Sequence, residues 1–153
     1  MKEQKEEKKI NYSKQGKKNR AAGVRFEAKI RAGLEEMGWI VDKWTNTIDY
    51  DREGKLGKVV PAKRKYNPFK KVMVIGTGFP DFICIKNTKG VFEVIGVEVK
   101  GNGYLDQVEK GMCHWLIENK VFSGILIAKK GNKRGEIEYI NFLEKYKKDF
   151  PAQ

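Results

Sequence analysis

The sequence predicts an α/β domain in which a central mixed β-sheet is flanked by helices. Three observations lead to this class: an amphipathic segment near the N-terminus, several β-branched runs after it, and a second amphipathic segment between two of those runs. The predicted order is helix, strand, loop, two strands, helix, two strands and a short final helix. A chain of 153 residues is long enough for one such domain.

The N-terminal part of the domain begins with a predicted helix over 20–37. Phe26, Ile30 and Leu34 recur at helical spacing there, with charged residues between them. A first strand is predicted over 39–46, where an apolar and β-branched run follows a glycine. We therefore expect this helix to pack its apolar side against the sheet that the strand begins.

The remaining strands are predicted from runs rich in β-branched and aromatic residues, over 71–76, 79–86, 91–100, 121–130 and 135–142. The turn at 87–90 joins two of these runs into a hairpin. A second helix is predicted over 104–119, because apolar residues again follow helical spacing. The tail over 143–150 predicts a short third helix.

Positive charge is concentrated in two segments. The chain has 32 Lys and Arg against 20 Asp and Glu, a net charge of +12. Residues 1–20 hold eight basic residues against three Glu, and residues 52–71 hold eight against one, so these segments supply +5 and +7. We expect residues 1–19 to form a basic flexible N-terminal arm, since they have few apolar groups to bury. Residues 20–153 then form a single domain with a basic loop at 47–71, whose glycines and prolines indicate a loop or an irregular hairpin.

This charge favours a polyanionic partner, above all nucleic acid. Tyr66 and Phe69 lie within the basic loop, and aromatic rings beside Lys and Arg can stack on bases while the cations contact phosphates. The alternative is that each lysine is ordinary solvated surface. The candidate DNA-binding residues are Lys55, Lys58, Lys63, Arg64, Lys65, Lys70 and Lys71.

Other features of the composition exclude several classes of protein. No run approaches the ~18 consecutive apolar residues of a membrane span, and the charged N-terminus is unlike a signal peptide. Two cysteines and one histidine leave little room for a disulfide scaffold or a zinc site. We expect a cytoplasmic protein that makes no membrane contact and associates with the nucleoid.

Two carboxylates and an ammonium fall at matched positions in the predicted hairpin. Asp81, in the only Pro-Asp pair of the chain, starts one strand. Glu98 and Lys100 lie near the end of the next strand, on one face because side chains alternate along a strand. Pairing about the turn at 87–90 places Asp81 opposite residues 96–98. The three charged groups are therefore predicted to converge at one edge of the sheet.

This combination of charged groups is typical of metal-assisted phosphodiester hydrolysis. Hard oxygen ligands suit Mg²⁺, with Mn²⁺ as a substitute. Lys100 is suited to orient an attacking water and to stabilise charge that develops on a phosphate. Glu-x-Lys occurs seven times in the chain, but only Glu98 and Lys100 lie within a β-branched run. The alternative interpretation is a strand end with an exposed salt bridge.

The chain resembles the PD-(D/E)XK nucleases, in particular archaeal Holliday junction resolvases and VRR-NUC domains. The similar segments are GVRFEAKIRAGLEEMGWIV (23–41), GTGFPDFICI (76–85) and VIGVEVKGNGYLDQ (94–107). The resemblance implies a restriction-endonuclease-like core and a symmetric homodimer. The chain departs from the family in its 47–75 insert, which is longer and more basic than in a compact resolvase, and in the L-D-Q-V surroundings of Gln107.

The resemblance also implies roles for individual residues. Asp81, Glu98 and the main-chain carbonyl of Val99 would hold the metal. Lys100 would be a catalytic residue beside them.

Glu27 and Gln107 complete the implied catalytic set, and each has a plainer interpretation. Glu27 would be an auxiliary carboxylate on the first helix, but it could equally pair with Arg31 at i+4 on the helix surface. Gln107 would join the site from the start of the second helix, but polar helix surface is the more common role for such a residue.

Together these features predict a Mg²⁺-dependent DNA endonuclease that acts on branched or structured DNA, as in recombination and repair. Two alternatives stay open. One is a non-catalytic nucleic-acid-binding module of the same fold, and the other is a repair nuclease of the VRR-NUC or restriction type. The sequence leaves the preferred DNA structure undetermined.

Overall fold

The computed structural model describes residues 12–50, 53–69, 71–74 and 78–151, and these form an α/β domain built on a mixed five-stranded sheet. The strand order in this sheet is β1-β6-β7-β8-β9. Only β7 and β8 pair in parallel, and the other neighbours pair antiparallel. The strands of the sheet are β1 (Ile40–Lys43), β6 (Phe82–Thr88), β7 (Val91–Val99), β8 (Gly124–Lys130) and β9 (Ile137–Asn141).

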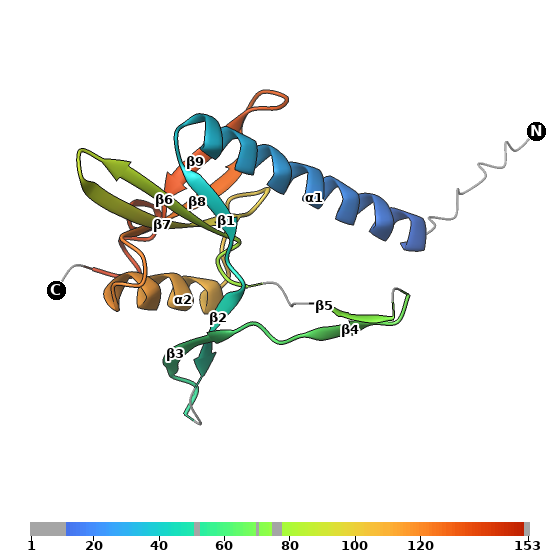
Figure 1. Ribbon diagram of the computed structural model, residues 1–153, viewed down its shortest axis with the longest axis horizontal. Coiled ribbons are helices and arrows are strands. Elements are labelled where there is room, and N and C mark those ends of the chain that lie inside the picture. The colour runs from blue at the N-terminus through green and yellow to red at the C-terminus, as the bar shows by residue number, and fades with distance from the viewer. Residues whose placement is uncertain (1–11, 51–52, 70, 75–77, 152–153) are drawn as a thin grey trace, which may run out of the picture.

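Helices α1 (Tyr12–Glu36) and α2 (Gln107–Glu118) pack on opposite faces of the sheet, and α3 (Phe142–Lys145) adds one turn after β9 (Figure 1). On the α1 face, Ile30 and Leu34 are buried against sheet residues that include Val41. On the α2 face, Met112, Cys113 and Leu116 form a second core with Ile125, Ile127 and Phe142. The predicted class, a mixed sheet flanked by helices, is confirmed.

The first helix begins earlier than the sequence suggested. Residues 12–19, expected within a flexible arm, form the first two turns of α1, while residues 1–11 lie outside the described part of the chain. Lys, Gln and Arg are good helix formers, and extending an existing helix adds one hydrogen bond for each residue fixed. The packed half of α1 therefore supports a basic extension that buries nothing itself.

The segment expected to be a basic loop or an irregular hairpin contains two short antiparallel ribbons, so the hairpin alternative is the closer one. β2 (Asn46–Tyr50) and β3 (Leu56–Pro61) form one two-stranded ribbon, and β4 (Lys65–Asn67) pairs with β5 (Val72–Val74) in another. Ile48 is only 3% exposed and belongs to the α2-side core, so it anchors the first ribbon to the domain. Glycines and prolines obscured this pattern in the sequence.

The predicted β6–β7 hairpin is confirmed, and its register decides where the charged residues lie. Phe82 pairs with Val97 and Cys84 with Ile95. Continuing this register by one residue sets Asp81 opposite Glu98.

None of the described helices combines the length and the hydropathy that crossing a membrane requires.

Candidate active site

Backbone hydrogen bonds between neighbouring strands hold the side chains of Asp81 and Glu98 close together. The backbone N–H of Asp81 donates to Glu98 Oε2 at 3.2 Å, and the backbone N–H of Val99 donates to Asp81 Oδ2 at 2.9 Å. Each carboxylate thus has one oxygen fixed by the neighbouring strand. The predicted convergence of these two residues is confirmed.

Two glycines let the backbone reach this arrangement. A Cβ atom on Gly96 would lie 2.7 Å from Cγ of Pro80, so Pro80 can pack on β7 only where that side chain is missing. A Cβ on Gly78 would lie 2.0 Å from the carbonyl oxygen of Trp44. The chain entering β6 is therefore pressed against both neighbouring segments, and this close packing places Asp81 at the strand end.

Burial sets the electrostatics of the carboxylate pair. Glu98 is 6% exposed and is the only buried charged residue in the part of the chain that the structure describes. Burial, followed by the negative charge of Asp81, raises the pKa of Glu98 to about 9. Burial also raises the pKa of Asp81, and the charge of Glu27 adds to this, although the Val99 N–H and two lysines act in the opposite direction.

Lys100 lies beside the carboxylate pair, as predicted. Its ammonium is held by Glu109, a residue that the sequence did not lead us to predict. Nζ of Lys100 is 3.7 Å from Glu98 Oε1 and 2.5 Å from Glu109 Oε1. Burial acts to lower the pKa of Lys100, but the hydrogen bond to Glu109 and the charge of Glu98 outweigh it, so the pKa is raised. Lys100 therefore carries its proton at neutral pH.

Glu109 is itself fixed at the start of α2. The side chain of Asp106 caps the helix by accepting from the Glu109 N–H at 2.8 Å, and Glu109 Oε2 accepts from the Asp106 N–H at 2.9 Å. This reciprocal capping box leaves the other oxygen of Glu109 for Lys100. The Asp-x-x-Glu spacing before an apolar helix was the signal in the sequence that could have identified Glu109.

Glu27 faces the sheet rather than pairing along its own helix. Its Oε2 lies 2.5 Å from Nζ of Lys43 on β1, while Arg31 pairs with Glu35 at 3.1 Å. The alternative of a Glu27–Arg31 pair is therefore wrong. Since Glu27 raises the pKa of Asp81, its carboxylate lies within electrostatic reach of the site.

Gln107 does not join this group. It is the first residue of α2 and is exposed, and the described residues give it no hydrogen bond to Asp81, Glu98 or Lys100. The side chain that reaches Lys100 from the start of α2 belongs to Glu109, two residues later.

A pocket of about 350 Å³ opens between α1 and the end of β7, and of the predicted site residues it is lined by Glu27 and Val99 but not by Asp81, Glu98 or Lys100. Glu27 and Phe26 line it from α1, and Val99, Gly101 and Lys130 line it from the sheet.

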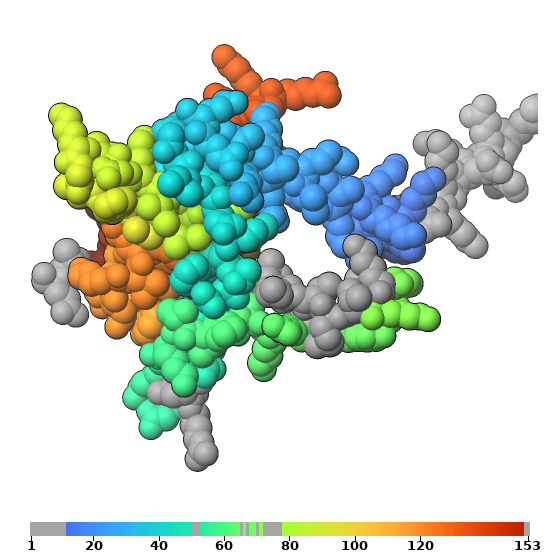
Figure 2. Space-filling view, viewed as in Figure 1, coloured from blue at the N-terminus to red at the C-terminus, as the bar shows by residue number. Residues whose placement is uncertain are grey.

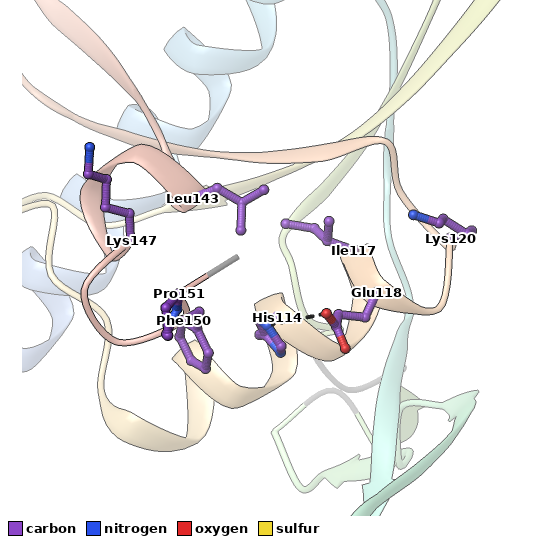
Figure 3. Close-up of a pocket in the computed structure, with 8 residues that line it drawn as sticks. All are labelled: His114, Ile117, Glu118, Lys120, Leu143, Lys147, Phe150 and Pro151. Atoms are coloured by element: carbon purple, nitrogen blue, oxygen red, sulfur yellow. Dashed lines mark ion pairs between the residues drawn. The ribbon is translucent and has the colours of Figure 1, made fainter. Parts of the chain in front are cut away.

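A larger pocket, of about 500 Å³, lies apart from the carboxylates, between α2 and the C-terminal segment (Figure 3). Ile117, Leu143 and Phe150 supply an apolar lining, and the His114 ring stacks on Phe150 with 4.2 Å between centroids. His114 is 3.6 Å from Glu118. No predicted site residue lines this pocket.

The predicted DNA-binding residues lie on the two ribbons. Lys58, Lys63, Arg64 and Lys71 are exposed, and Lys55 is exposed in an ion pair with Glu53 at 2.6 Å. Lys70 lies outside the described residues, as does the side chain of Lys65. Figure 2 shows that the N-terminal half of α1 and the β4–β5 ribbon project from the same side of the molecule.

The donor set at the strand ends fits a hard divalent cation. The described residues contain no cluster of three or more His, Cys, Asp or Glu side chains with metal-binding geometry. Asp81 and Glu98 supply two carboxylates, and the third ligand that the resemblance implies is a main-chain oxygen, that of Val99. Burial raises the pKa of both carboxyls, and the charge of Asp81 raises that of Glu98 further, so a nearby positive charge stabilises their ionised forms, and oxygen donors suit Mg²⁺ or Mn²⁺.

Comparison of the chain with protein-family models, curated proteins and solved structures finds no match. Function must therefore be inferred from the geometry and chemistry of the site.

Proposed function

We propose that this chain is a metal-dependent DNA endonuclease that hydrolyses phosphodiester bonds in branched or structured DNA. The observation that carries the proposal is the meeting of Asp81 and Glu98, from adjacent strands, beside Lys100. Holding two carboxylates together in a desolvated place costs free energy, so such a pair is typical of a site that binds a cation. The fold proposed for this arrangement is a restriction-endonuclease-like core.

Asp81, Glu98 and the main-chain oxygen of Val99 would hold Mg²⁺, with Mn²⁺ as a substitute. When bound, the ion polarises the phosphate and lowers the pKa of a bound water. The backbone N–H bonds to Asp81 and Glu98 fix the direction of both carboxylates before the ion arrives.

Lys100 acts as a hydrogen-bond donor and a cation. Its raised pKa keeps it protonated, which excludes it as the base that takes a proton from water at neutral pH. An ammonium within 4 Å of Glu98 is placed to orient the attacking water and to stabilise charge on the phosphate oxygens. Glu109 is the positioning residue that aims Lys100.

The basic segments supply affinity for the substrate. The N-terminal half of α1 and the β4–β5 ribbon project from the same side of the domain (Figure 2), and exposed basic residues on and beside them can contact the phosphates of a DNA arm. A homodimer making two equivalent cuts, and association with the nucleoid, belong to the same proposal. A binding module without catalysis is the weaker candidate, because a protein that only binds DNA gains nothing from two carboxyl groups held together in a desolvated place, which costs free energy.

A cleavage panel tests the proposal. Four-way junctions, flaps, single strands and plain duplex would be incubated with Mg²⁺, with Mn²⁺ and with EDTA, using wild-type protein and Asp81→Asn purified identically. We expect metal-dependent cleavage by the wild type, fastest on a branched substrate, and none by the variant. Binding of these DNAs without cleavage under any metal condition would overturn the enzyme assignment.

A further inference from the structure

The loop that follows Lys100 presents an aromatic ring to solvent. Tyr104 is 68% exposed, although it lies only four residues after Lys100. Four residues span at most ~14 Å of extended chain, and here the Gly103 N–H donates back to the Lys100 carbonyl at 2.8 Å, which shortens the path. The backbone of Tyr104 is therefore held within ~14 Å of that of Lys100, the neighbour of the carboxylate pair.

Both flanks of Tyr104 are anchored, so the ring is not on a freely moving loop. The Tyr104 N–H donates to Asn102 Oδ1 at 3.0 Å. The next N–H, from Leu105, donates to the Tyr146 hydroxyl at 3.0 Å, and the Leu105 side chain is 6% exposed. The backbone at Tyr104 is thus preorganised by the fold.

One lysine lies over this ring, and a second packs on the residue before it. Nζ of Lys145 lies 4.2 Å from the Tyr104 ring centroid and also donates to the Gly103 carbonyl. The stem of Lys129 packs so closely on Gly103 that a Cβ there would lie 2.8 Å from its Cδ. Burial, followed by the positive charge of Lys129, lowers the pKa of Lys145.

Lys145 is not neutralised by a direct ion pair. Lys129 pairs with Glu138 at 3.0 Å, whereas among the described residues no carboxylate lies within 4 Å of the Lys145 ammonium. A cation beside an exposed ring, with a second cation close by, is a site that favours an anionic ligand with a flat, polarisable surface.

We propose that Tyr104 is a stacking platform for an unpaired base next to the cleaved bond, and that Lys145 binds the adjoining phosphate. Aromatic rings interleaved with cations are how proteins hold single-stranded nucleic acid, because each base has a face that can stack and each nucleotide carries a phosphate. Bases inside a duplex already stack on their neighbours, so Tyr104 selects DNA with an unpaired nucleotide at the cut. The position of that cut rests on the proposed function.

Binding in EDTA separates stacking from cleavage. A flap and a matched duplex, each with 2-aminopurine at the branch nucleotide, would be titrated with wild type, Tyr104→Ala and Tyr104→Phe. We expect Tyr104→Ala to bind the flap roughly 5- to 150-fold more weakly, the range that corresponds to ~1–3 kcal/mol of base stacking, with little change for duplex. Tyr104→Phe should bind the flap as tightly as the wild type does, because it keeps the ring. Quenching of 2-aminopurine fluorescence should disappear only in Tyr104→Ala.

Phe92 provides a matched control, because it is 69% exposed at the tip of the β6–β7 hairpin, far along the strands from Glu98. Phe92→Ala should bind both DNAs as the wild type does. Lys145→Gln should lower the salt slope for flap binding by ~0.7, the value for one phosphate contact on a single strand. The melting temperature of each variant checks that it is folded.

The outcomes distinguish this inference from the proposed function. Tyr104-dependent quenching by a protein that cleaves nothing would refute the nuclease and support the platform. Cleavage of flaps at the same rate by wild type and Tyr104→Ala, with unchanged quenching, would refute the platform and leave the nuclease standing. An equal loss of flap and duplex binding in Tyr104→Ala would also overturn the platform, since no unpaired base would then be involved.

Discussion

The carboxylate site and the basic ribbons differ in charge, in burial and in how firmly the fold holds their side chains. Asp81 and Glu98 are partly or fully buried, and the register of two central strands fixes them through backbone hydrogen bonds. The basic residues of the ribbon region whose side chains the structure describes are exposed, and Ile48 holds the β2–β3 ribbon to the core. Chemistry needs fixed geometry, whereas attraction to phosphate needs only charge near the right place.

Breaking the carboxylate site should separate catalysis from binding most sharply. Asp81→Ala and Glu98→Ala should each lower the cleavage rate by at least ~10³-fold, since losing a metal ligand removes several kcal/mol of transition-state stabilisation. DNA affinity without metal should stay unchanged or rise for Asp81→Ala, which removes a negative charge near phosphate, and should stay unchanged for Glu98→Ala, because Glu98 with a pKa of about 9 is protonated at neutral pH. Rates under single turnover and anisotropy titrations measure the two effects. Loss of binding in a folded variant would contradict the metal-site assignment.

The next largest effect should come from Lys100 and its positioning residue. Lys100→Met should slow cleavage ~10²–10³-fold, and Glu109→Gln about 10-fold, because the second change leaves the ammonium present but aims it less well. Glutamine keeps the capping box, so Glu109→Gln should fold normally.

Asp106→Ala is the matched control for this pair. It removes the cap and lowers the free energy of unfolding by ~1 kcal/mol, but it retains the Glu109 carboxylate. If Asp106→Ala slowed single-turnover cleavage as much as Glu109→Gln does, helix stability rather than the aim of Lys100 would be responsible.

Breaking the ribbons should do the reverse, weakening binding while sparing the chemical step. Neutralising Lys58, Lys63 and Arg64 together should flatten the plot of log K against log salt by up to ~0.9 for each phosphate that the protein no longer neutralises. Cleavage at saturating DNA should keep the wild-type rate. Lys120 and Lys147, which line the pocket on the other side of α2, serve as controls. An unchanged salt slope would remove the ribbons from the DNA-binding surface.

The smallest effect should appear in stability. A carboxyl with a higher pKa in the folded state keeps a proton that the unfolded chain releases, so Glu98 lowers the free energy of unfolding as pH rises from 4.5 toward about 9. Glu98→Gln removes this cost. Without metal, the variant should melt at least ~2–4 °C above the wild type at pH 8, which is the shift that ~1 kcal/mol produces in a chain of this size. At pH 5 the two melting temperatures should lie closer together. Equal melting temperatures at pH 8 would contradict the burial of Glu98.

The hairpin was predictable because its signals are local. The turn at 87–90 and the β-branched residues on either side fix the pairing of β6 with β7, and side-chain alternation then determines which residues meet. Asp81, Glu98 and Lys100 could be placed together on this basis alone. The E-x-K spacing became informative only because it falls inside that strand.

Other features depended on contacts between distant segments. The pairing of Glu27 with Lys43 joins α1 to β1, and nothing in helix periodicity distinguishes it from a pair with Arg31. The ribbon strands were hidden because Ile48 is stabilised by α2, about sixty residues away in the chain. The resemblance pointed to Gln107 and not to Glu109, because a family pattern gives a position in the sequence, whereas the contact to Lys100 depends on how α2 docks.

By itself, the sequence determined the α/β class, the β6–β7 register and the location of the net charge, because periodicity, turns and composition are properties of neighbouring residues. Only the tertiary structure decided the burial of Glu98, the partner of Lys100 and the lysine over the Tyr104 ring. Each of these depends on the packing of a helix or a strand end against a distant segment. The positions of the excess positive charge can be found in the sequence, but the acidic site forms only when the sheet brings distant residues together.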